Sequence, residues 1–132
     1  MSTQLIKFNV CLYKKDDISH DDFVKWIKED WTKKALPVLK EYGIVKFTLT
    51  TTPPCFREPF RQALVGPMGR PQWTVPDYDI VISYWLKSVE DLEKATKDPR
   101  WIELEEKEVL EKTNMALGHF VIGHESVVFG VE

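Results

Sequence analysis

Histidine, the side chain best suited to proton transfer near neutral pH, occurs three times in this chain. His119 and His124 lie five residues apart on a predicted strand and face opposite sides of it, so at most one can line a pocket. Gly123 leaves room for close approach beside His124, so we rank His124 first. For each histidine the alternative is a single hydrogen bond at a sheet edge. His20 follows a helix cap, where we expect it to be exposed.

Lys7 and Asn9 are further candidates because they share one face of a predicted strand that alternates over residues 5–13. If Lys7 is buried, its pKa falls, and it could act as an acid or hold a substrate carboxylate. Alternatively, Lys7 reaches solvent along its aliphatic stem and Asn9 bonds a neighbouring backbone group. The sequence leaves both alternatives open.

Asp79 stands at the start of another predicted strand, where a carboxylate could orient a histidine, act as a base, or form a turn. Tyr84 and Trp85 alternate on that strand, so one of them faces the pocket and the other the opposite side. Arg61 belongs to the long connection at residues 53–76. It could clamp a substrate carboxylate or be a solvated charge.

Metal or cofactor chemistry has no support in the sequence. The His-x-x-x-His, Cys-x-x-Cys and Glu-x-x-His spacings of metal sites are absent, as are a Gly-rich phosphate loop and a nucleophile elbow. The glutamates of residues 101–112 are typical of a solvated helix face. We therefore expect a reaction that uses no cofactor and no metal.

A strand followed by a capped helix occurs twice and would position these groups. In each copy a Ser-x-x-Asp box, Ser19 to Asp22 and then Ser88 to Asp91, predicts the start of a helix. Alternating segments predict four strands, at residues 5–13, 44–52, 79–86 and 119–129. The order β-α-β-β-α-β predicts an α+β fold with a ferredoxin-like sheet, helices on one face and a pocket between the layers.

The connection at residues 53–76 is long for a compact domain. It contains six of the eight prolines together with Phe56, Phe60 and Trp73, and this aromatic content argues against disorder. We expect an irregular segment with one short helical turn near residues 60–64. We interpret it as a lid that excludes water from the pocket.

The composition limits the possible partners. The 132 residues predict one domain, 1–132, and 43% hydrophobic residues suffice for a core. With 18 basic and 21 acidic side chains the net charge is −3, which is unsuited to nucleic acid. Apolar stretches are far shorter than the roughly 20 residues of a membrane span, and the N-terminus lacks a signal-peptide pattern. We expect a cytoplasmic protein with no membrane partner, in which Cys11 and Cys55 are reduced thiols.

Several local patterns together resemble the EthD-like branch of the dimeric α+β barrel superfamily. They are LIKFNVCLYKK, SHDDFVKWIKEDW, EYGIVKFTLTTTPP, DYDIVISYW, KDPRW and HFVIGHE. The chain resembles in particular the small fungal members of aromatic polyketide pathways called dehydratases or decarboxylases. This resemblance implies a homodimer in which the pocket lies between sheet and helices and the opposite sheet face packs against the second subunit.

The same resemblance assigns the faces of the first strand. It would place Lys7 and Asn9 in the pocket and the apolar face at the dimer interface, namely Phe8, Val10 and Leu12. Many relatives carry a histidine on the first helix where this chain has Trp31, and polyketide cyclases have one where this chain has Trp101. A further histidine of many relatives falls in the turn that reads Thr-Thr-Thr-Pro here. A pocket without these histidines and rich in tryptophan suits a flat apolar substrate.

The predicted function is that of a cofactor-independent lyase, a decarboxylase or dehydratase, acting on an aromatic polyketide-type intermediate of secondary metabolism. Either reaction needs a group that stabilises an enolate and a source of a proton. The alternatives are a polyketide cyclase or pericyclase on the same fold, or a ligand-binding barrel without activity. The predicted catalytic residues are His124, Lys7, Asn9, Asp79, His119 and Tyr84. The predicted substrate-binding residues are Trp31, Trp73, Trp85, Trp101, Phe23, Ile82 and Arg61.

Overall fold

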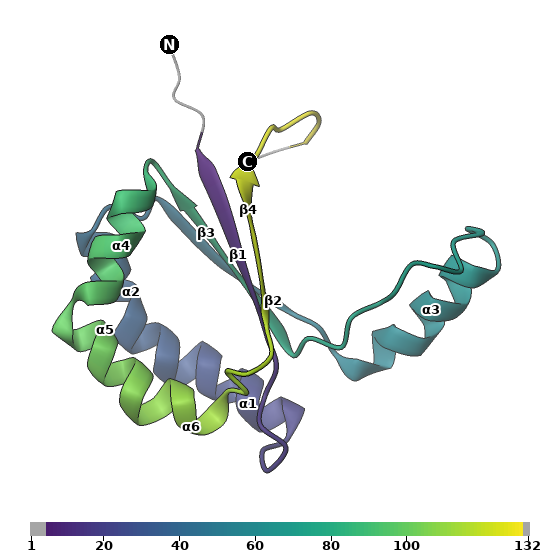
Figure 1. The fold of residues 1–132 in the computed structure, drawn as a ribbon, viewed down its shortest axis with the longest axis horizontal. Coiled ribbons are helices and arrows are strands. Elements are labelled where there is room, and N and C mark those ends of the chain that lie inside the picture. Colours follow the sequence, from purple (N-terminus) through teal and green to yellow (C-terminus); the bar gives the residue numbers. More distant parts are fainter. Residues whose placement is uncertain (1–4, 131–132) are drawn as a thin grey trace.

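The computed structural model describes residues 5–130, which contain a four-stranded antiparallel sheet with helices on one face (Figure 1). The strands are β1 (Ile6–Leu12), β2 (Lys46–Thr51), β3 (Ile80–Leu86) and β4 (His119–His124). Their order in the sheet is β2-β3-β1-β4. This is the ferredoxin-like α+β arrangement that the order of elements predicts. β4 ends at His124, five residues before the predicted end of the last strand.

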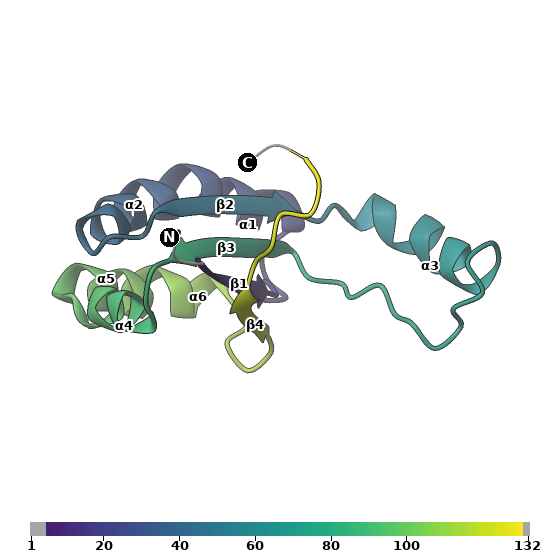
Figure 2. The same cartoon turned by 90° about the horizontal axis from the view of Figure 1, so that it is seen from above.

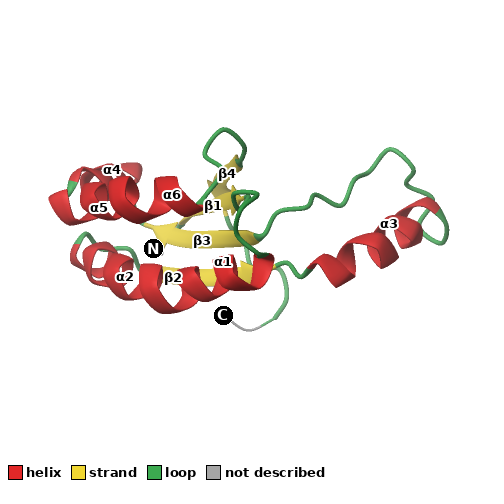
Figure 3. Cartoon of the chain, turned by 90° about the horizontal axis from the view of Figure 1, so that it is seen from below, coloured by secondary structure: helices red, strands yellow, loops and turns green. Residues whose placement is uncertain are grey.

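Two helical paths run across the same face of the sheet, one after β1 and one after β3 (Figure 3). The first consists of α1 (His20–Trp26), the π-helical segment η1 (Ile27–Trp31) and α2 (Thr32–Glu41). The second consists of α4 (Val89–Lys97), α5 (Pro99–Leu104), the π-helical segment η3 (Glu105–Val109) and α6 (Leu110–Lys112). None of the helices in residues 5–130 is long and apolar enough to cross a membrane.

The caps explain where the helices begin. The backbone N–H of Asp22 donates to Ser19 Oγ at 3.1 Å, which confirms the first predicted capping residue. The second predicted helix, α4, begins directly after Ser88, as expected. The prediction that the Ser88 side chain caps this helix is wrong, since it accepts no hydrogen bond from the first turn. Asp98 instead caps α5 by accepting a hydrogen bond from the backbone N–H of Arg100 at 2.9 Å.

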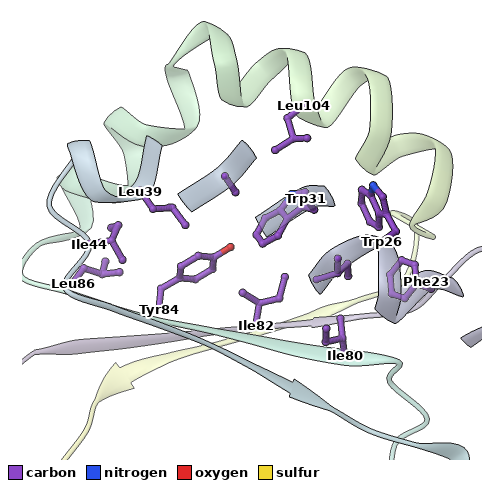
Figure 4. Packing of buried hydrophobic residues seen from close by; sticks show 12 residues of the cluster. Phe23, Trp26, Trp31, Leu39, Ile44, Ile80, Ile82, Tyr84, Leu86 and Leu104 are labelled. Carbon is purple, nitrogen blue, oxygen red and sulfur yellow. The ribbon is translucent and has the colours of Figure 1, made fainter. Parts of the chain in front are cut away.

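The core lies between the helical paths and the sheet (Figure 4). Phe23 and Trp26 of α1 and Trp31 of η1 pack towards Ile80 and Ile82 of β3. Leu104 reaches the same cluster from the second helical path. Truncating a fully buried aromatic side chain such as Phe23 to alanine is expected to cost about 3–5 kcal/mol of stability.

Residues 53–76, called the arm from here on, project away from the sheet and its helices (Figures 1 and 2). The arm contains the short 3₁₀ segment η2 (Pro54–Phe56) and α3 (Arg57–Val65), so its helix is longer than the predicted turn. Its base is tied to the body through the carbonyl oxygen of Tyr78, which accepts hydrogen bonds from Thr52 Oγ1 and, at 3.2 Å, from the Arg57 guanidinium. The segment is predicted to be a lid, but the arm points away from the helical side and none of its residues lines the cavity there, so it does not cover the pocket of this chain in the structure of residues 5–130.

Candidate active site

A cavity of about 350 Å³ lies between the sheet and the helices, where the sequence predicts a pocket. This volume falls within the range of small-molecule sites. Its walls come from β1, β3 and β4 on one side and from the two helical paths on the other. Its aromatic lining residues are Phe8, Trp26, Trp31, Tyr84, Trp101 and Phe120.

The apolar face of β1 lines this cavity, which reverses the predicted assignment of its two faces. The cavity-lining residues of β1 are Phe8, Val10 and Leu12. Asn9 lies on the opposite face, where its Oδ1 accepts a hydrogen bond from Ser83 Oγ at 2.6 Å. The physical reason is that the apolar stripe of the helices must be buried against an apolar sheet face within the same chain.

Lys7 is held on that opposite, helix-free face of the sheet. Its Nζ lies 3.0 Å from Glu125 Oε2 and 4.9 Å from the centre of the Trp85 ring. Trp85 Nε1 donates to the Glu125 carboxylate at 2.9 Å, and Lys46 lies over the same ring. Lys7 and Trp85 therefore belong to one cluster outside the cavity, contrary to their predicted places in it.

Tyr84 brings a phenol into the cavity. It is only 4% exposed, and its hydroxyl points from β3 towards Trp31 (Figure 4). Within residues 5–130 this hydroxyl has no hydrogen-bond partner. Burial raises the pKa of Tyr84 far above its usual range. The group therefore stays protonated and is free to donate a hydrogen bond to a ligand.

Trp31 and Trp101 form an aromatic corner of the cavity. Their ring centres lie 5.9 Å apart with the planes at 74°, an edge-to-face contact. Ile82, a predicted substrate-binding residue, also lines the cavity, whereas Phe23 is completely buried in the core beside it. Trp73 lies on the arm and is 60% exposed. Two of the four predicted tryptophans are thus placed in the cavity.

Both π-helical segments contribute to the cavity wall. The first and last residues of η1, Ile27 and Trp31, line it, as do the first and last residues of η3, Glu105 and Val109. The π geometry of η1 is visible in the backbone N–H of Thr32, which donates to the carbonyl oxygen five residues earlier. Such segments are rare and are often found at functional sites.

Glu105 and Thr113 are cavity residues that are not among the predicted site residues. Glu105 is half-buried and lines the cavity, although it is predicted to be solvated; its position four residues after Trp101 was the available signal. Thr113 is completely buried, and in the described part of the chain, residues 5–130, its hydroxyl has no hydrogen-bond partner. Glu108 also departs from the prediction: its carboxylate accepts a hydrogen bond from Trp26 Nε1 at 2.9 Å and pairs with Lys34.

The predicted histidines do not reach the cavity. His124 pairs with Ile6 in the sheet and therefore lies on the opposite face from Lys7, so these two side chains cannot meet. His124 is exposed at the sheet edge and does not line the cavity. His119 lies on the other face, with its Nδ1 2.7 Å from Tyr78 Oη. Arg61 pairs with a glutamate on the arm, Glu58, at 3.1 Å.

Asp79 and His20 form a separate polar pair at the end of the sheet. His20 Nδ1 lies 2.8 Å from Asp79 Oδ1, and the backbone N–H of Lys14 donates to Asp79 Oδ2 at 2.9 Å. The His20 side chain is 14% exposed, so the prediction of an exposed residue is wrong. Asp79 does orient a histidine, as one prediction allowed, but neither residue lines the main cavity. Residues 5–130 contain no cluster of three or more His, Cys, Asp or Glu side chains that could hold a metal ion.

Two curated fungal proteins are similar to this chain. "Dehydratase iacD" of Pestalotiopsis fici is 29% identical over 98 residues, which are 74% of this chain and 70% of that protein. "Dehydratase aurZ" of Gibberella zeae is 28% identical over 99 residues, 75% of this chain and 62% of that protein. The chain thus spans less than two thirds of the length of the second relative.

Solved structures resemble the chain in fold. HapK from Hahella chejuensis superposes with a TM-score of 0.61 at 11% identity and covers 96% of this chain and 97% of its own. A dimeric ferredoxin-like protein from an uncultured marine organism superposes with a TM-score of 0.57 at 14% identity, over 98% of this chain and 94% of its own. The sequence signature of the EthD domain matches residues 15–110, which include the first helical path, most of the second and all three tryptophans that line the cavity, Trp26, Trp31 and Trp101. The chain belongs to the EthD domain family.

Proposed function

We propose that this chain is a cofactor-independent lyase of the dehydratase type that acts on a flat, largely apolar, aromatic polyketide-type intermediate. The observation that carries the proposal is Tyr84, a buried and protonated phenol whose hydroxyl faces an aromatic cavity and has no hydrogen-bond partner among residues 5–130. The hydroxyl oxygen itself is accessible from the cavity, so a ligand can accept its hydrogen bond there. The dehydratase names of the two fungal relatives support the reaction class.

In the proposed reaction, Tyr84 donates a hydrogen bond to a substrate carbonyl oxygen and stabilises the enolate that forms there. The Glu105 carboxylate removes the proton from the carbon next to that carbonyl. Protonated Glu105 then gives this proton to the hydroxyl group on the following carbon, the carbon–oxygen bond breaks, and water leaves. A carbon–carbon double bond remains, and Glu105 returns to its carboxylate form. No redox partner is needed.

Trp31 and Trp101 support the aromatic nature of the substrate. Their edge-to-face arrangement presents apolar ring surface to the cavity, and a flat ring system packs well against such surface. An apolar wall with a few convergent polar groups is the usual design of a small-molecule site.

Decarboxylation of a related acid is a second candidate, because the same enolate would form when carbon dioxide leaves. Cyclisation by a pericyclase is a third, and the predominance of apolar groups in the cavity lining favours it. A ligand-binding barrel would show occupancy without turnover. The chemical change of the substrate separates these candidates.

The experiment is to incubate the purified protein with a panel of polyketide-derived aromatic β-hydroxy ketones and acids and to follow product masses. Loss of water supports the dehydratase, loss of carbon dioxide the decarboxylase, and an isomer of unchanged mass the cyclase. The matched control is Tyr84→Phe, which keeps the ring and removes the hydroxyl. Equal turnover by wild type and Tyr84→Phe would contradict the proposed role of the phenol.

We also propose that the protein works as a homodimer. Large apolar side chains are exposed on the edge strand β4, namely Phe120, Val121 and Ile122. Exposed apolar surface on an edge strand favours association with another chain. The dimeric state of the ferredoxin-like protein from the marine organism supports this.

A further inference from the structure

We propose that the arm of one copy of this chain closes the cavity of a second copy. The proposal deepens the function proposed above, since it rests on the cavity being the substrate site. It replaces the predicted lid over the arm's own cavity by a lid over the partner's. Each copy would supply one arm and receive one, as two-fold symmetry requires.

The arm carries an apolar surface that its own chain does not cover. Phe56 and Phe60 contact one another edge to face, and each is 57% exposed. Val65, Met68 and Trp73 are exposed as well. Solvent exposure of several large apolar side chains on one projecting segment indicates a binding surface rather than a free loop.

The cavity has a wall that its own chain leaves unfinished. Met115 and Phe120 line it, yet they are 48% and 71% exposed. Both stand on the side where β4 forms the edge of the sheet. Exclusion of water, which the proposed elimination requires around its enolate, therefore needs a further apolar group over this side.

The charges of the two surfaces are complementary. The arm has three arginines and one glutamate, a net charge of +2. Arg61 pairs with Glu58 and Arg57 lies 3.9 Å from Asp79, so Arg70, over the Trp73 ring, is the arginine of the arm that forms no ion pair within residues 5–130. Residues 103–112, which run along the cavity, contain five glutamates and two lysines, a net charge of −3. Glu106 and Glu111 in this stretch are exposed and form no ion pair within residues 5–130. Opposite charges of this kind favour arm docking and orient it.

A second copy is the occupant that these observations favour over an unrelated protein. Every chain carries both halves of the contact. One half is the basic apolar arm, and the other is the rim of the cavity, which consists of the acidic residues 103–112 and the exposed apolar residues Met115 and Phe120. In the observed conformation the arm does not reach the rim of its own chain, because it projects away from the sheet and its helices (Figure 1). If two copies exchange their arms, each arm covers the cavity of the other copy, and both rims are buried.

The first test measures association by sedimentation at several protein concentrations. Wild type is expected to be a dimer, and Phe60→Ser and Trp73→Ser are each expected to weaken dimerisation by roughly tenfold or more, as for buried aromatic anchors. Gln72→Ala, an exposed polar position of the arm, is the matched control and should leave the dimer unchanged. Circular dichroism should show that all variants fold, because these side chains are outside the core. A wild type that stays monomeric, or arm variants that dimerise like wild type, would overturn the proposal.

The second test asks which surface the arm meets. One copy carries Cys55→Ser and Phe60→Cys, the other Cys55→Ser and Met115→Cys with a size tag; the remaining Cys11 is buried. On mild oxidation the mixture should give a disulfide-linked heterodimer on a non-reducing gel. Lys40→Cys on α2, exposed and not lining the cavity, replaces Met115→Cys in the control and should give no such band. No cross-link to Met115→Cys, or an equal one to Lys40→Cys, would contradict the proposal.

Neither test needs a substrate, so the two proposals can fail separately. Arm exchange without any turnover would contradict the proposed dehydratase function and support the proposed docking of the arm. Turnover by a monomer would support the dehydratase function and contradict the proposed docking. High salt should weaken the dimer, because the arm and rim charges are exposed and screened.

Discussion

His20 Nδ1 lies 2.8 Å from Asp79 Oδ1, which joins the start of α1 to the start of β3 across 59 positions of the sequence. The second carboxylate oxygen of Asp79 accepts the backbone N–H of Lys14 at 2.9 Å. One buried carboxylate thus ties together the segments that lead into the first helix and the central strand. Its loss is expected to loosen the end of the sheet from which the arm departs.

Asp79→Ala should lower the free energy of unfolding by about 2–4 kcal/mol, because it leaves His20 and the Lys14 N–H without their acceptor. His20→Ala should cost about 1–2 kcal/mol. The double variant should cost less than the sum, with a coupling of at least about 0.5 kcal/mol. Urea denaturation measures all three, with Asp17→Ala at an exposed position as the control. Strict additivity would show that the pair does not act together.

Tyr84→Phe should separate stability from activity. The phenol hydroxyl has no hydrogen-bond partner in residues 5–130, so its removal should change the free energy of unfolding by less than about 1 kcal/mol. Turnover should fall by roughly 10²-fold or more, the usual effect of removing one donor to a developing oxyanion. Tyr13→Phe, outside the cavity, should keep wild-type turnover. A large loss of stability without a specific loss of turnover would indicate a structural role.

Glu105→Gln should abolish proton removal while keeping the shape of the side chain. We expect kcat to fall by roughly 10²-fold or more with KM little changed, since a general base acts mainly in the transition state. The matched control is Glu93→Gln, at an exposed position of α4 that does not line the cavity, and it should behave like wild type. Steady-state kinetics with the substrate identified by the mass assay provides the measurement. A raised KM with unchanged kcat would assign Glu105 to binding alone.

Glu108 should make stability depend on pH. Partial desolvation raises the pKa of Glu108, but hydrogen bonds from Lys34 and Trp26 lower it by more, so the folded-state pKa lies below that of the unfolded chain. A depressed carboxyl pKa stabilises the fold above the unfolded value of about 4.3, and this contribution disappears as the pH falls through the folded value.

Glu108→Gln should therefore destabilise the protein by about 1–2 kcal/mol at neutral pH and by less in acid. Urea midpoints of variant and wild type at neutral and acidic pH measure this difference. Glu111→Gln, at an exposed position of the same helical path, controls for the loss of one charge. A stability difference that stays constant with pH would contradict the proposed contribution of the Lys34 and Trp26 bonds.

The fold could be predicted because its signals are local. Alternation of side chains located all four strands, and the Ser19 box located the start of α1. The two faces of β1 could not be assigned in this way, because Phe8, Val10 and Leu12 could equally cover helices of the same chain or a second subunit. In the structure these residues face the helices of the same chain, because the apolar side of the helices must be buried there.

The candidate site could be predicted only where the fold alone places a residue. Tyr84, Trp31 and Trp101 lie in the cavity because strand alternation and helix position bring them there. The burial of His20 cannot be predicted locally, because its partner, Asp79, is distant in the sequence. The place of Glu105 cannot be predicted either, because a run of glutamates is typical of a solvated surface and gives no indication of which member faces inward.

Because of the two π-helical segments, the shape of the cavity depends on the number of residues in η1 and η3. In an uninterrupted α-helix, side chains five residues apart diverge by about 140° around the axis. Trp26 and Trp31 have this spacing, yet both line the cavity, because η1 takes an extra residue into its turn. Deleting one residue from η1 or η3 would give a more regular helix and rotate part of the lining away. The volume open to a ligand thus depends on the direction in which each side chain leaves its helix axis, as well as on the identity of the side chain.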